Sequence, residues 1–125
     1  MAQVAPGEAE VIESAQIQRA IKIAEKRTGL NWSVFIGDLG EDPRAEAVER
    51  HGALGAAATG SILLAVDPNA HRLEIVTGSR ARKRLDDHSC ALAAASMAGT
   101  FAVRDLDGGI ARGILALAEH VRSSS

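Results

Sequence analysis

An apolar run at residues 61–66 that returns through a short turn sets the strongest limit on the fold. The run reads SILLAV, and because it is almost uniformly apolar it predicts a strand buried on both faces of a sheet. Residues 67–70 read DPNA, with proline at the second position of a turn. Residues 72–77 read RLEIVT, with Arg72 and Glu74 facing outward as on an edge strand. So short a link predicts an antiparallel hairpin.

Three segments with clear boundaries precede this hairpin. Residues 14–28 have apolar side chains at helical spacing and predict an amphipathic helix. Residues 31–37 read NWSVFIG, a β-rich run between turn residues that predicts a strand. Asp42 is placed to cap a helix over residues 43–51 that has proline at its first position. The glycine- and alanine-rich residues 52–60 are expected to form a loop.

Two predicted helices follow the hairpin and complete the arrangement. The first, residues 86–101, carries one apolar stripe made of Cys90, Ala94, Met97 and Phe101. The second, residues 107–122, is apolar at i, i+4, i+7 and i+11. A strand, a helix and a strand in succession predict a parallel pair with a right-handed crossover. The expected fold is an α/β three-layer sandwich with a small mixed sheet and helices on both faces.

A length of 125 residues suits one domain with a single core. We expect a flexible N-terminal tail over residues 1–13, one α/β domain over residues 14–122 and a frayed C-terminus over residues 123–125. The first residues lack the basic segment and apolar run of a secretory signal. No stretch approaches the roughly 18 apolar residues of a spanning helix. The expectation is a cytoplasmic protein without membrane insertion.

Composition excludes some partners. Aromatic residues make up 2 % of the chain, too few for the base-stacking platforms of proteins that bind single-stranded nucleic acid. A net charge of −2 gives no overall field for DNA. The lone Cys90 cannot form an intrachain disulfide, and its apolar stripe predicts a buried, unreactive thiol. The alanine-rich stretch 91–98 leaves homo-oligomerisation open, because a second copy could cover its small-residue face.

Glycines and apolar residues around the hairpin and the last helix resemble those of a known family. The residues that carry the pattern are Gly60, the strand 62–66, Ile75, Gly78, Asp105 and Gly109. The last two fit a Gly-Asp-x-x-x-Gly-like helix entry, with Arg104 at the position of the leading glycine. Over about residues 31–121 this pattern resembles the TPM domain family.

The resemblance implies a three-layer α/β fold and one of two kinds of activity. TPM domains have been proposed as metal-dependent acid phosphatases and as partner-binding modules, with acidic residues on loops at one end of the sheet. One of these acids precedes the glycine that enters the middle strand. Here Ala58 and Thr59 precede Gly60, so that acid is missing. The departure counts against a full metal site and against phosphatase chemistry.

Three aspartates form the candidate metal site. Asp38 follows the first predicted strand, where ligands bind in open α/β sheets, and Asp105 and Asp107 open the last helix. Their oxygens could hold Mg²⁺ or Ca²⁺ with water completing the shell. The alternative is structural: Asp105 or Asp107 is a helix N-cap and Asp38 is a turn residue. No cofactor is certain from the sequence.

Four cations form the candidate anion site: Arg80, Arg82, Lys83 and Arg84. They follow the hairpin directly and could receive a phosphate or an acidic partner. The alternative is a solvated face whose charge Asp86 and Asp87 balance.

Two hypotheses about function follow. The first is a non-catalytic TPM-like module that binds a protein partner or a small anion at a loop end carrying Asp38, Gly60, Gly78 and Asp105. The second is a metal-dependent acid phosphatase in which Asp38, Asp105 and Asp107 hold the ion and Arg80 orients phosphate.

Overall fold

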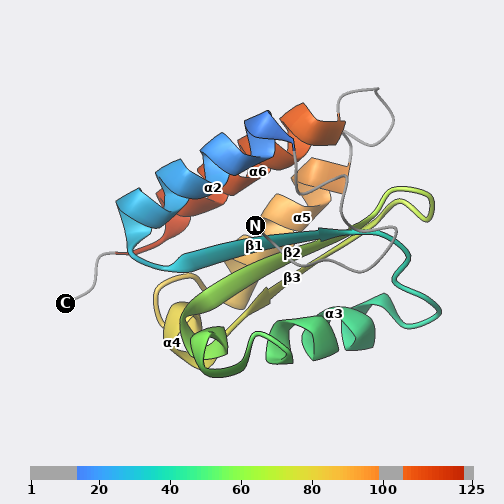
Figure 1. Cartoon of the computed structure of the whole chain (residues 1–125), viewed down its shortest axis with the longest axis horizontal. Coiled ribbons are helices and arrows are strands. Elements are labelled where there is room, and N and C mark those ends of the chain that lie inside the picture. Colours follow the sequence, from blue (N-terminus) through green and yellow to red (C-terminus); the bar gives the residue numbers. More distant parts are fainter. Residues whose placement is uncertain (1–13, 99–105, 123–125) are drawn as a thin grey trace.

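The computed structural model describes residues 14–98 and 106–122 of the chain. A three-stranded sheet lies between two layers of helices, with the central strand buried along its whole length (Figure 1). The strands, in spatial order, are β1 (Asn31–Ile36), β2 (Ser61–Asp67) and β3 (Arg72–Thr77). This confirms the predicted three-layer α/β sandwich.

The sheet is mixed, as the hairpin and the β-α-β order predict. β1 and β2 are parallel, with Trp32 opposite Ile62, and β2 and β3 are antiparallel, with Leu64 opposite Ile75. Side chains alternate between the two faces along each strand. Both faces of β2 are covered, which is why its sequence is a continuous apolar run rather than an alternating one.

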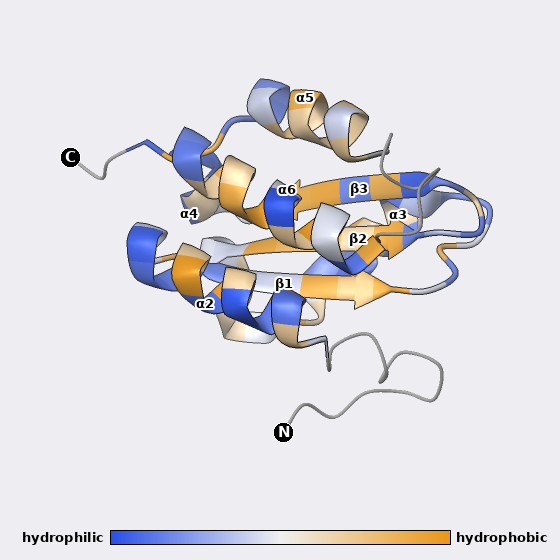
Figure 2. Ribbon diagram, turned by 90° about the horizontal axis from the view of Figure 1, so that it is seen from above, coloured by the Kyte–Doolittle hydropathy of each residue, from blue (hydrophilic) through white to orange (hydrophobic). Residues whose placement is uncertain are grey.

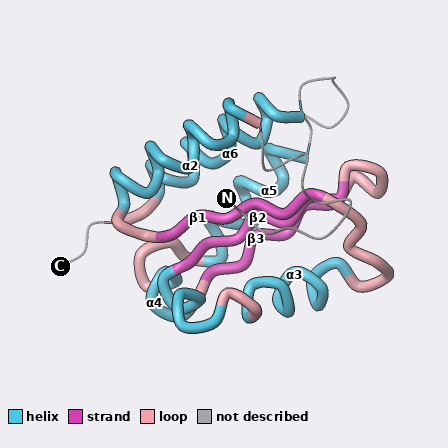
Figure 3. The backbone as a smooth tube through the Cα atoms, viewed as in Figure 1, coloured by secondary structure: helices cyan, strands magenta, loops and turns pink. Residues whose placement is uncertain are grey.

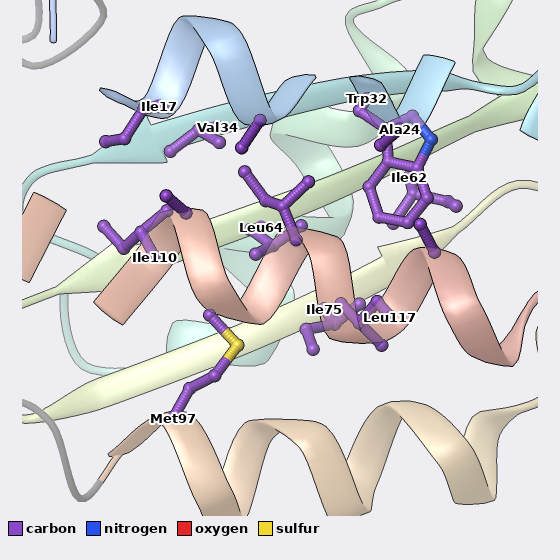
Figure 4. Packing of buried hydrophobic residues seen from close by; sticks show 14 of the residues in the cluster. Ile17, Ala24, Trp32, Val34, Ile62, Leu64, Ile75, Met97, Ile110 and Leu117 are labelled. Atoms are coloured by element: carbon purple, nitrogen blue, oxygen red, sulfur yellow. The ribbon is translucent and has the colours of Figure 1, made fainter. Parts of the chain in front are cut away.

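One face of the sheet is covered by α2 (Ala15–Thr28), α5 (Asp87–Ala98) and α6 (Leu106–His120). Figure 2 shows α2 over the β1 side and α5 over the β3 side, with α6 between them. The larger core lies in this layer. Ile62 and Leu64 of β2 are fully buried in it, in one cluster with Ile110 and Leu117 of α6 (Figure 4).

The opposite face is covered by α3 (Pro43–Gly52) and has a smaller core. Its buried members are Phe35, Leu39, Ala47, Leu63, Ala65 and Val76. The guanidinium of Arg50 lies 3.7 Å from the centroid of the Phe35 ring and covers the outer side of this core.

Local signals account for the ends of the first two helices. The Ser14 hydroxyl accepts a hydrogen bond from the Ile17 N–H, and Gly29 ends α2 in the left-handed conformation at φ 76°. The Asp42 carboxylate accepts the Ala45 N–H at the start of α3, and Pro43 is the first helical residue.

Two short elements differ from the sequence-based expectation. The predicted loop over residues 52–60 contains a 3-10 helix, η1 (Gly55–Gly60), and a one-turn helix, α4 (Ser79–Arg82), follows β3. These differences are visible in Figure 3 as helical turns at one end of the sheet. Cys90 and Met97 of the predicted α5 stripe are buried, while Phe101 lies outside the described residues. Among the described helices, none has the length and apolar character needed to cross a membrane.

Candidate functional site

The direction of the strands separates residues that we expected to share one surface. Asp38 follows the C-terminal end of β1, which is the end where β2 also finishes. Gly60 and Gly78 lie at the other end, where the Gly78 N–H donates to the Ser61 carbonyl at 3.0 Å. A loop end carrying Asp38 together with Gly60 and Gly78 was therefore a wrong prediction. The physical reason is that β1 and β2 are parallel, so Gly60 at the start of β2 lies a full strand length from Asp38.

The candidate metal ligands are not brought into a recognisable cluster by the described part of the chain. Asp38 is exposed, and its carboxylate accepts the Gly40 N–H at 2.8 Å, the role of a turn residue. Asp107 is exposed in the first turn of α6, and Asp105 lies outside the described residues. Within residues 14–98 and 106–122, no group of three or more His, Cys, Asp or Glu side chains could hold a metal ion.

Gly60 and Gly78 have a packing role that the sequence did not reveal. A Cβ atom at Gly78 would overlap the Ala58 carbonyl oxygen, and one at Gly60 would overlap the guanidinium of Arg80. The absence of both side chains lets the segment after β3 pack closely on η1. Arg80 therefore lies with its guanidinium directly on the backbone of Gly60.

Two of the four candidate anion ligands are occupied by structural bonds. Arg82 Nη2 donates to the Thr77 carbonyl at 2.7 Å, and its Nε lies 3.3 Å from the Thr77 hydroxyl. Arg84 Nη1 donates to the Thr28 carbonyl at 2.9 Å, and its Nε donates to the Arg122 carbonyl at 2.8 Å. Arg84 thus joins the ends of α2 and α6 to the segment before α5.

The other two cations are available. Arg80 and Lys83 are exposed, and neither side chain has a hydrogen bond or ion pair in the part of the chain that the structure describes. Because Arg84 bonds the end of α2, the last turn of that helix lies at the same end of the molecule. This turn adds Lys26 and Arg27, which are likewise exposed and unpaired among the described residues.

We call Lys26, Arg27, Arg80 and Lys83 the basic end. Lys26 and Arg27 suit the dipole of their own helix, and nothing local in the sequence indicates which other segment lies beside them. Arg122 joins the same region, where its Nη2 donates to the Lys83 carbonyl at 2.7 Å.

Most acids near the basic end have other partners. Asp86 accepts the Ser89 N–H at 2.7 Å, which lowers the pKa of its carboxyl, and it lies 3.5 Å from Arg122 Nη1. A Glu25 oxygen accepts the Trp32 N–H at 3.2 Å. Glu119, in the last turn of α6, is exposed and offsets part of the positive charge. The region therefore keeps a local excess of cations although the chain as a whole carries a net charge of −2.

Cys90 is buried, as its stripe predicts. Burial, together with the nearby carboxylates of Asp87 and Asp86, raises the pKa of the thiol to about 11. At neutral pH it is therefore a protonated thiol, a poor nucleophile and a poor metal ligand.

A family model described as a domain of unknown function, DUF5130, matches residues 6–118. The chain belongs to the DUF5130 family. Two uncharacterized proteins of Mycobacterium tuberculosis, Rv2468c of strain H37Rv and MT2543 of strain CDC 1551, are each 29% identical to this DUF5130 domain over 116 residues. The match covers 82% of this chain and 68% of each relative.

Two solved structures share the fold of this DUF5130 domain. The N-terminal domain of a P. gingivalis protein superimposes with a TM-score of 0.74 at 15% identity, covering 89% of this chain and 76% of that one. The N-terminal domain of the cg2496 protein from Corynebacterium glutamicum gives a TM-score of 0.69 at 18% identity, covering 98% of this chain and 77% of that one. At these identities the likeness concerns the fold alone.

Proposed function

We propose that this DUF5130 domain is a non-catalytic, TPM-like module that binds an acidic protein segment through the basic end. The observation that carries the proposal is that four exposed cations lie at one end of the molecule, on the last turn of α2 and on the segment that starts at α4, without acidic partners among the described residues. Complementary charge on a partner would steer its association and fix its orientation.

The arrangement of the cations favours a protein segment over a single small anion. The four side chains are exposed on two separate segments, and one exposed ion pair contributes only about 0–1 kcal/mol. A segment with several carboxylates can engage several of these cations at once. Arg80 is the most constrained of them, because its guanidinium lies on the Gly60 backbone.

The test is a titration of the isotope-labelled protein with an acidic decapeptide of alternating Asp and Glu, followed by amide NMR shifts at low salt. We expect saturable shifts centred on α4 and the last turn of α2. Replacing Arg80 and Lys83 together with Glu should weaken binding about tenfold or more, because two attractive charges become repulsive.

The matched control replaces Arg19 and Lys22 with Glu. These are two exposed cations in the middle of α2, and the net charge changes by the same amount. Equal losses in the two double variants would show attraction by net charge alone and would overturn the proposal. Saturable shifts produced by inorganic phosphate, but not by the peptide, would overturn it in favour of small-anion binding.

The metal-dependent acid phosphatase is the competing hypothesis. It rests on the TPM resemblance and on Asp38, Asp105 and Asp107, while the missing acid before Gly60 favours binding. Hydrolysis of p-nitrophenyl phosphate with Mg²⁺ or Ca²⁺, lost on Asp105→Asn, would replace the binding module with this enzyme. No turnover and no metal-dependent shifts at these loops would exclude it.

A further inference from the structure

A groove runs along the outer edge of β3. It has a volume of about 330 Å³ and lies between this strand, α5 and the Arg44 side chain of α3. Its apolar lining comes from Leu73 and Ile75 on the strand and from three small residues of α5, Cys90, Ala91 and Ala94. The small side chains of α5 leave space beside the strand that larger residues would fill.

The edge of β3 presents backbone groups to this groove. The hydrogen bond from the Gly78 N–H to the Ser61 carbonyl identifies which residue pairs of β2 and β3 are hydrogen-bonded to each other. Hydrogen-bonded pairs alternate along such a ladder, so Leu73 and Ile75 direct their N–H and C=O groups away from β2. Arg44 Nη1 confirms this direction, because it donates to the Ile75 carbonyl at 2.9 Å.

Arginines protect part of this edge and leave another part open. Arg44 covers the Ile75 carbonyl, and Arg82 covers the Thr77 carbonyl at 2.7 Å. Such capping limits uncontrolled pairing with other strands. Within residues 14–98 and 106–122, the N–H and C=O of Leu73 and the N–H of Ile75 have no partner on this side, in the stretch that faces the groove.

The two carboxylates that line the groove differ in how accessible they are to a ligand. Glu74 is neutralised by Arg44 at 3.5 Å and by Arg72 at 3.8 Å. The Asp87 side chain is 79% exposed, and its ion pair with Arg82 Nε spans the long distance of 4.0 Å. The groove therefore offers an accessible negative charge beside an apolar floor.

We propose that an extended peptide adds to the edge of β3 at Leu73, with an aliphatic side chain in the groove and a lysine or arginine two residues away against Asp87. Alternate residues of an added strand point to the same face as Leu73 and Ile75, which is the face covered by α5. Backbone pairing supplies affinity in this mode, and the two side chains supply specificity.

The probe is a capped pentapeptide, Thr-Val-Thr-Lys-Thr, compared with the same peptide carrying Glu in place of Lys. Leu73 and Ile75 line the groove, so the shifts of their backbone amides in NMR spectra report its occupancy. We expect the Lys peptide to shift these two amides saturably and to bind about tenfold more tightly than the Glu peptide.

A charge reversal makes the test specific. Asp87→Lys should reverse the preference, so that the Glu peptide binds more tightly, while Glu49→Lys on the exposed surface of α3 should leave it unchanged. Ala94→Leu should reduce binding of both peptides by narrowing the groove, whereas Ala95→Leu, at an exposed position of α5, should not. If neither peptide shifts the Leu73 and Ile75 amides, or if Asp87→Lys does not alter the preference, the proposal is wrong.

Discussion

At the scale of single residues, the molecule depends on positions where a side chain is absent. Gly78 has an ordinary φ of −71°, so its conformation does not require glycine. Its requirement is steric, because a Cβ would meet the backbone carbonyls of Ala58 and Thr59, which cannot rotate away. The sequence contains 12 glycines, and local patterns alone do not indicate which of them have this role.

We predict that Gly78→Ala lowers the free energy of unfolding by about 2 kcal/mol or more, the cost of overpacking. Urea denaturation, followed by the fluorescence of the single tryptophan, measures the change. Gly52→Ala is the matched control, since a Cβ there meets nothing within 4 Å. A Gly78→Ala protein as stable as the control would contradict the close packing of α4 on η1.

The second prediction at this scale concerns the Cys90 thiol. Its pKa is raised to about 11, whereas the same thiol in the unfolded chain ionises near its ordinary pKa of 9.0. Between these values the unfolded chain has lost a proton that the folded chain keeps, so stability falls as pH rises. Well below pH 9.0 the thiol is protonated in both states and contributes no pH dependence.

Comparing wild type with Cys90→Ala at about pH 7.5 and about pH 10 isolates this contribution from that of the lysines. We expect the wild type to lose more stability than the variant between the two values. Thiol labelling near neutral pH should also be about a hundredfold slower than in the unfolded chain, because the higher pKa leaves fewer thiolates. Equal pH dependence of the two proteins would contradict a raised pKa.

At the scale of elements, Arg84 holds helix ends together. Its guanidinium donates to the last carbonyl of α2, at Thr28, and to the Arg122 carbonyl beyond α6. The Arg122 N–H in turn donates to the Arg84 carbonyl at 2.8 Å. Carbonyls at helix C-termini lack intrahelical partners, so a cation that donates hydrogen bonds to them stabilises both helices and their relative position.

We predict that Arg84→Met destabilises the domain by about 2 kcal/mol, since two charge-assisted hydrogen bonds are lost at a half-buried site. Arg19→Met, at an exposed position in the middle of α2 without a partner among the residues that the structure describes, should change stability by less than about 0.5 kcal/mol. Thermal unfolding of both variants provides the comparison. If Arg84→Met instead lost affinity for the acidic decapeptide and kept its stability, Arg84 would be an anion ligand and not a structural residue.

Elements with complete local signals were predictable, and those without them were not. Helices α2 and α3 have cap residues at their starts, and β2 and β3 have a tight turn between them. In contrast, α4 is a single turn without a side-chain cap, and η1 is a 3-10 helix in a run of small residues. Such segments adopt helical turns because the surrounding packing selects them, not because their own residues favour helix.

Buried polar contacts between elements were also beyond local reasoning. Asp67 was assigned only to a turn, yet its carboxylate accepts the Leu39 N–H at 3.0 Å and the Ala70 N–H at 3.1 Å. One carboxylate therefore joins the segment after β1 to the hairpin turn. The two partners are 28 and 3 positions away, and only the second lies within the range of a turn pattern.

At the scale of the whole molecule, a net charge of −2 conceals an uneven distribution. The basic end collects cations from the last turn of α2 and from α4 and the residue after it, while Asp38 lies at the opposite end of the sheet, after the C-terminal end of β1. Total charge describes only the overall field of the chain. It could not predict a local excess, because that excess depends on which helix ends meet.

The α/β class, the mixed sheet and the hairpin follow from the amino-acid sequence alone, because apolar periodicity, helix caps and turn residues act over a few positions. Which polar residues share a surface became visible only in the folded molecule. In the folded molecule Asp38 and Gly60 lie at opposite ends of the sheet. Arg82 and Arg84 donate hydrogen bonds to backbone carbonyls, and the last turn of α2 lies at the same end as α4. These outcomes depend on strand direction and on contacts between distant segments, and no local pattern encodes either of them.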